Sequence, residues 1–215
     1  MSRLRHFAVV TVVPVVSALL LTGLSSARSA EPALPEKVTV HDSRTSAPVV
    51  DIARVRLEAS WYWDSEQYVR IKVPNGFRPG HRLTVYFDLD GDSTPDGNLD
   101  LRLREPRKPG GKLLRKIQEF RLGGGWTHRG ELVRCTGSEG FRPVGEVRRG
   151  QRNVTLGLDL WWCLKVASPA GTDAGSWRAA VRLAKGRKAD MAPNGRRWSP
   201  PVAGWGPCDP SGGQC

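Results

Sequence analysis

The segment 88–100 carries the residues whose types and spacing most resemble those of a metal site. Counted from its start, aspartates occupy the first, third, fifth and ninth positions, as Asp88, Asp90, Asp92 and Asp96. Carboxylates at alternate positions of a tight loop can converge on one Ca²⁺, as in EF-hands. The twelfth position is Leu99, so the bidentate glutamate that completes an EF-hand is missing. Asp, Gly, Asn, Ser and Pro favour turns, so a plain hairpin connection is the first interpretation of this segment. The alternative is a calcium-stabilised loop, whose ligands would be these four aspartates.

Aromatic residues are the second group with binding potential. The chain has 8 tryptophans, several of them in segments expected to be turns. The run Trp61-Tyr62-Trp63 straddles the end of an expected strand, so at least one of its rings must point outward. An exposed aromatic face can stack on a sugar ring, and these three residues are therefore the predicted binding edge. The alternative is that the indoles cover the open ends of the core.

The cysteines are expected to form disulfides. All 4 lie in the second half of the chain, as Cys135, Cys163, Cys208 and Cys215. An even number in an exported protein indicates disulfide bonds, and four cysteines allow three pairings. Proximity along the chain favours Cys135 with Cys163 and Cys208 with Cys215. The second pair would close a small loop at the tail.

Catalytic patterns are missing from the sequence. The chain contains no G-x-S-x-G, no H-E-x-x-H and no G-x-x-x-x-G-K-[ST]. The run Gly123-Gly-Gly125 lacks the lysine and the helix that a phosphate-binding loop needs. We therefore expect a protein that is not an enzyme.

The first residues indicate export. Arg3 and Arg5 precede an apolar run from Phe7 to Leu21, and small residues follow up to Ala30. This order predicts a signal peptide over residues 1–30 and a secreted mature protein. No second long apolar segment follows, so the mature chain is expected not to span a membrane. The formal net charge is +12, and the mature part stays strongly basic, which favours polyanionic partners in general.

Alternation of apolar and polar residues predicts an all-β domain. Val55 and Leu57 alternate with Arg54, Arg56 and Glu58, and the same period of two recurs along the chain. No helical period lasts beyond a turn, the best candidate being 158–164. Turn-punctuated strands without amphipathic helices predict an antiparallel β-sandwich. The expected organisation is a disordered linker over 31–48, the sandwich over 49–200 and a disulfide-closed loop tail over 201–215. Strands are expected near 38–40, 53–59, 68–73, 83–87, 99–104, 116–122, 132–135, 153–158 and 177–183.

A family resemblance accompanies these patterns. The run from Val85 to Asp92, followed by Pro95-Asp96 and an alternating strand, resembles the centre of a group of uncharacterised secreted proteins from high-GC bacteria. The strand opening at Asp51, the pair Cys163-Leu164 and the segment 191–200 fit the same group. Its architecture is similar to DOMON and family-nine carbohydrate-binding modules. The resemblance implies a β-sandwich and specifies no reaction.

These observations favour a non-catalytic extracellular binding module for a glycan or a cell-wall polymer. The alternative is a structural or polyanion-associated surface protein with a calcium-stabilised loop. A nucleic-acid partner has no support from an RNP, KH or helix-turn-helix pattern.

Overall fold

The computed structural model describes residues 34–43, 47–59, 67–127, 130–133, 145–158 and 176–203. These residues form strands and one short 3-10 turn, η1 (Pro48–Val50). None of their helical segments is long and apolar enough to cross a membrane. The strands are β1 (Lys37–His41), β2 (Arg54–Ala59), β3 (Gln67–Lys72), β4 (Arg82–Asp88), β5 (Gly97–Arg104), β6 (Arg115–Leu122), β7 (Glu131–Val133), β8 (Asn153–Leu158), β9 (Ser176–Lys185), β10 (Lys188–Ala192) and β11 (Val202–Ala203).

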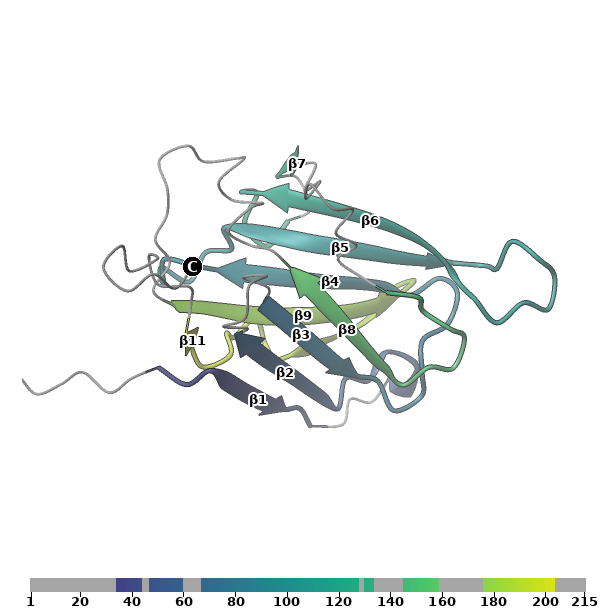
Figure 1. The fold of residues 1–215 in the computed structure, drawn as a ribbon, viewed down its shortest axis with the longest axis horizontal. Helices are drawn as coiled ribbons and strands as arrows, with labels where there is room; N and C mark the ends of the chain where they lie inside the picture. Colours follow the sequence, from purple (N-terminus) through teal and green to yellow (C-terminus); the bar gives the residue numbers. More distant parts are fainter. Residues whose placement is uncertain are drawn as a thin grey trace, which may run out of the picture. The chain divides into compact units, whose positions relative to one another are not determined.

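The strands form two antiparallel sheets that pack face to face, as Figure 1 shows. One is a 4-stranded sheet in the order β1-β2-β3-β8. The other is a 7-stranded sheet in the order β10-β9-β4-β5-β6-β7, with β11 paired to β9. The prediction of an all-β sandwich is confirmed.

The core lies between the sheets because alternate residues of each strand point inward. Val55 and Leu57 of the 4-stranded sheet are buried, as are Leu83 and Val85 of the 7-stranded sheet. Among the described residues, Trp177 on β9 is the bulkiest fully buried side chain. The predicted alternation in β2, β3, β4 and β5 therefore places the core residues as expected.

The outward positions of the 7-stranded sheet depart from the expected pattern. Thr84, Tyr86 and Asp100 point away from the core between the sheets, yet each is at most 2% exposed. Arginine side chains cover Asp100, and the ring of Trp126 lies against Tyr86. This face of the sheet is thus partly covered by its own long side chains.

Two expected boundaries need correction. The range 31–48 contains β1, which pairs with β2 from Lys37 to His41 and so belongs to the sheet, unlike a disordered linker. The range 201–215 begins with β11, whose Val202 is the Cα partner of Trp177.

The strand β10 was not predicted from the sequence. Its sequence, KADMA, is poor in β-branched and aromatic residues, and a tight turn after β9 brings it into register.

Candidate functional site

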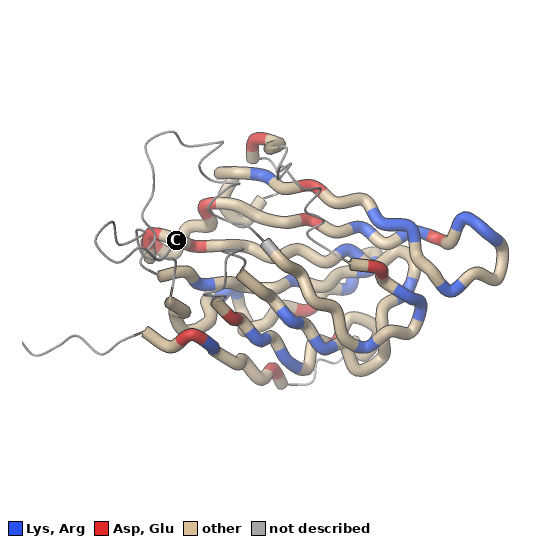
Figure 2. Tube along the Cα trace, viewed as in Figure 1, with Lys and Arg blue, Asp and Glu red and all other residues tan. Residues whose placement is uncertain are grey.

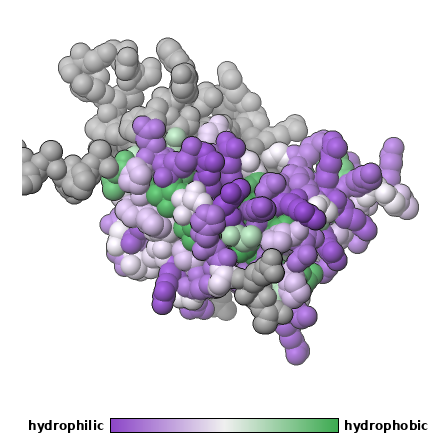
Figure 3. Space-filling view, turned by 90° about the horizontal axis from the view of Figure 1, so that it is seen from below, coloured by the Kyte–Doolittle hydropathy of each residue, from purple (hydrophilic) through white to green (hydrophobic). Residues whose placement is uncertain are grey.

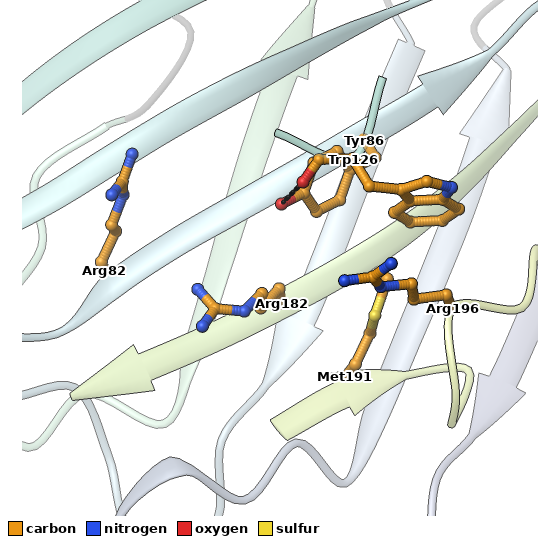
Figure 4. A pocket seen from close by; sticks show the side chains of 6 residues that line it. All are labelled: Arg82, Tyr86, Trp126, Arg182, Met191 and Arg196. Carbon is orange, nitrogen blue, oxygen red and sulfur yellow. Dashed lines mark hydrogen bonds between the residues drawn. The ribbon is translucent and has the colours of Figure 1, made fainter. Parts of the chain in front are cut away.

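A concave site lies on the outer face of the 7-stranded sheet (Figure 4). Its cavity measures about 350 Å³. β4 supplies two of the lining residues, β9 and β10 supply one each, and two come from segments that follow β6 and β10. We call it the aromatic–arginine site, and it is lined by Arg82, Tyr86, Trp126, Arg182, Met191 and Arg196.

Strand register brings these residues together. Arg182 on β9 is the Cα partner of Thr84 on β4 and of Met191 on β10. Tyr86 is the Cα partner of Ala180, whose small side chain leaves room above the sheet. The outward-facing positions of three neighbouring strands therefore form the floor of the cavity.

The aromatic side of the site is a row of three rings in tilted contact, which we call the aromatic row. The ring centroids of Tyr86 and Trp126 lie 5.0 Å apart, and those of Trp126 and Trp198 lie 4.9 Å apart. The Tyr86 hydroxyl donates a long hydrogen bond of 3.4 Å to the carbonyl of Trp126. Burial raises the pKa of Tyr86 despite the nearby charges of Arg182 and Arg82, so its hydroxyl stays protonated. Trp126 is only half-buried and lines the cavity.

The arginines differ in how firmly they are held. The Nε of Arg82 donates to Oδ1 of Asp100 at 2.6 Å, which fixes this guanidinium at the edge of the cavity. Arg182 and Arg196 make no hydrogen bond or ion pair with any residue in the described ranges. Arg196 also adopts a φ of 58°, in the left-handed region that is costly for a residue with a Cβ. Two guanidinium groups therefore face the cavity uncommitted.

The acidic loop, residues 88–96, contacts the Trp198 end of the aromatic row. Asp88 is fully buried and forms an ion pair with Arg178, and the Arg178 guanidinium lies 5.8 Å from the ring centroid of Trp198. The indole Nε1 of Trp198 donates to the carbonyl of Ser93 at 3.2 Å. The loop thus holds Trp198 in place against Trp126.

The loop is also extensively bonded to itself. Asp88 accepts hydrogen bonds from the backbone N–H of Gly91 at 2.7 Å and of Ser93 at 3.2 Å. Asp96 accepts one from Leu89 at 2.7 Å. Burial, together with the neighbouring carboxylates Asp90, Asp88 and Asp92, raises the pKa of Asp96 against the effect of that hydrogen bond. These contacts are those of a tight β4–β5 connection.

Three of the four predicted calcium ligands come together. Asp88, Asp90 and Asp96 each offer a carboxylate oxygen, and these oxygens lie within 4.8 Å of one another. Asp92 is outside that group and instead accepts the backbone N–H of Thr94 at 2.6 Å. Carboxylate oxygens are the ligand type that Ca²⁺ prefers, and these three would supply part of its usual set of about six to eight oxygens.

Several predicted site residues lie outside the described residues. These are the expected aromatic edge and all the cysteines, namely Trp61, Tyr62, Trp63, Cys135, Cys163, Cys208 and Cys215. The helical turn expected at 158–164 and the signal peptide over 1–30 also fall there, except that Leu158 ends β8.

Sequence reasoning missed the aromatic–arginine site. In the sequence, Tyr86 and Arg182 occupy the polar positions of alternating strands, and Trp126 is one of several tryptophans in segments expected to be turns. The sequence signal that could have indicated the site is the cluster of Arg196, Arg197 and Trp198, which lies in a segment with no expected strand. It gave no indication of which strand these residues would meet.

Comparison of the chain with protein-family models, with curated proteins and with solved structures finds no match in any of the three. The function is therefore argued from the geometry of the site.

Proposed function

We propose that the protein is an exported, non-catalytic binding module for an acidic glycan or an acidic cell-wall polymer. The observation that carries this proposal is the meeting of a half-buried Trp126 ring with the uncommitted guanidinium groups of Arg182 and Arg196 in one cavity. The leading signal-like segment supports export, and the basic charge of the chain supports an acidic ligand.

The residues that line the cavity match two chemical features of a ligand. An indole ring offers a flat apolar face that suits the C–H side of a sugar ring. A guanidinium group offers donors in a fixed fork that matches a carboxylate or a phosphate. A sugar unit bearing an acidic group satisfies both parts of the site at once.

The proposal can be tested by comparing how strongly the protein binds two polymers that differ only in charge. Polygalacturonate and its methyl ester share a sugar backbone, and only the first carries carboxylates. In affinity electrophoresis of the full mature chain, we expect retardation by polygalacturonate and weak retardation by the ester. The double variant Arg182→Gln, Arg196→Gln should weaken polygalacturonate binding at least tenfold, since a hydrogen bond to a charged group contributes about 1.5–3 kcal/mol before solvent screening.

Matched controls separate the site from general charge. The variant Lys108→Gln, Lys112→Gln changes the net charge by the same amount on the exposed β5–β6 loop and should leave binding unchanged. Trp126→Ala should weaken binding at both low and high salt, because an aromatic contact is not screened as a charge is. Equal loss in both double variants, or no binding of either polymer, would refute the proposal.

A further inference from the structure

Lys and Arg residues gather at the end of the 7-stranded sheet opposite the acidic loop, as Figure 2 shows. Because β4 and β5 are antiparallel, the acidic loop at 88–96 and the β5–β6 loop at 105–114 lie at opposite ends of this strand pair. The turns before β4, before β8 and between β9 and β10 lie at the same end as the β5–β6 loop. We call this end the basic end, and its cations are Arg78, Arg104, Arg107, Lys108, Lys112, Arg115, Arg148, Arg149, Arg152, Lys185, Arg187 and Lys188.

Few of these cations are neutralised. Glu105 pairs with Arg149 at 2.6 Å, and Glu146 lies 3.8 Å from Arg148. None of the other cations of the basic end makes an ion pair within the described ranges. Like charges held this close repel one another, so a surface that supplies negative charge would relieve the repulsion.

The β5–β6 loop projects beyond the sheets at this end (Figure 1). At its base, Leu113 is 48% exposed and lies between Lys112 and the buried Leu114. Hydrophilic side chains dominate the same end in the space-filling view of Figure 3, where apolar surface is confined to separate patches. The loop thus presents one large apolar side chain surrounded by cations.

The available side chains distinguish between polyanions. Single-stranded nucleic acids and glycans are gripped by exposed rings on which bases or sugars stack. The aromatic rings described at the basic end belong to Phe77 and His81, which are 0% and 1% exposed. Cations around an exposed leucine instead match the interface of an anionic bilayer, where cations meet headgroups and apolar side chains enter the acyl boundary.

We propose that the basic end docks the protein on an anionic lipid surface, with the β5–β6 loop lying along the headgroup layer so that Leu113 at its base also contacts the lipid interface. The docked orientation turns the acidic loop away from the negative surface. This contact is independent of the aromatic–arginine site, whose cavity lies on the outer face of the sheet.

Vesicle flotation with the full mature chain tests this proposal. The probes are vesicles of phosphatidylcholine alone and of phosphatidylcholine mixed with phosphatidylglycerol. We expect binding only to the anionic vesicles and a steep decrease with salt. Each neutralised cation near the surface should lower the partition coefficient about fivefold, so Lys108→Gln, Lys112→Gln should lower it about 25-fold.

The control is Arg182→Gln, Arg196→Gln, which removes the same charge from the aromatic–arginine site and should retain vesicle binding. Leu113→Ser should also weaken binding to the anionic vesicles, and this loss should persist at high salt. Absence of binding to anionic vesicles at low salt, or equal loss in the two double variants, would overturn the proposal. If Lys108→Gln, Lys112→Gln abolishes polygalacturonate binding and spares vesicle binding, the basic end takes a polymer and the lipid contact is refuted.

An unchanged vesicle affinity in Leu113→Ser would overturn the placement of the loop in the interface. Failure of polygalacturonate binding with intact vesicle binding would refute the proposed glycan function alone, so the two proposals fail separately.

Discussion

Asp100 is a buried carboxylate on the outer face of the 7-stranded sheet, and its replacement by asparagine should destabilise the protein. Its side chain is 1% exposed and accepts hydrogen bonds from Nε of Arg82 at 2.6 Å, Nε of Arg102 at 2.8 Å and the hydroxyl of Thr84 at 3.2 Å. Burial acts to raise the pKa of Asp100, but the hydrogen bonds and charges of the two arginines outweigh it and lower the pKa below its ordinary value.

The size of the effect follows from these contacts. A hydrogen bond to a charged group contributes about 1.5–3 kcal/mol. The Arg82 and Arg102 side chains are 31% and 40% exposed, so solvent screening brings both bonds to the lower part of that range. Because asparagine keeps one acceptor oxygen, we expect Asp100→Asn to lower the free energy of unfolding by about 2–3 kcal/mol. The melting temperature should fall by roughly 5–10 °C.

Urea unfolding of the wild type, Asp100→Asn and Glu105→Gln is the assay. Glu105 also pairs with an arginine at 2.6 Å, but its side chain is 71% exposed, so its loss should cost less than about 0.5 kcal/mol. The stability from Asp100 is present above its unfolded pKa near 4 and is lost as the pH falls through its lower folded pKa. The gap between wild type and Asp100→Asn should therefore narrow in acid. Equal costs for the two variants, or a gap independent of pH, would refute the reasoning.

Three further predictions concern other parts of the fold. If the acidic loop binds calcium, as the alternative interpretation of its sequence has it, ~10 mM Ca²⁺ should raise the free energy of unfolding by about 1.4–2.7 kcal/mol, for the affinity typical of extracellular calcium modules. The rise should vanish in Asp90→Asn and survive in Asp92→Asn, and calorimetry showing neither heat nor a melting shift in the wild type contradicts that role. Burial, with smaller contributions from the charges of Lys185 and Arg78, lowers the pKa of His81 to about 4, so its folded form resists protonation. Stability should accordingly fall by about 3 kcal/mol as the pH drops from about 6.5 to 4, and His81→Asn should remove this slope in urea titrations. Gly76 has a φ of +70°, and a Cβ there would lie 2.5 Å from the carbonyl oxygen of Gly150. Gly76→Ala should therefore destabilise by more than Gly110→Ala, which has a similar φ of +73° and open space around it, and equal melting temperatures would contradict the clash.

Local pattern sufficed for the fold class and for most strands. Val55, Leu57, Leu83 and Val85 alternate with polar residues, and alternation alone states which side chains face a core. Strands that depend mainly on pairing with a neighbouring strand could not be predicted from this alternation. β10 owes its place to its register with β9, and the two residues of β11 depend on pairing beside Trp177.

The composition and spacing of the chain by themselves determined an all-β sandwich, its core residues and a tight acidic connection after β4. Only the tertiary structure decided which outward-facing residues meet. Tyr86, Trp126 and Trp198 are far apart in sequence, and their rings come into contact because strand pairing and the returning loops place them on one face. The burial of Asp100 likewise depends on arginines brought to it by strand register. Period two assigns a side chain to a face of a sheet, but its neighbours on that face are set by non-local strand pairing, which the sequence pattern does not encode.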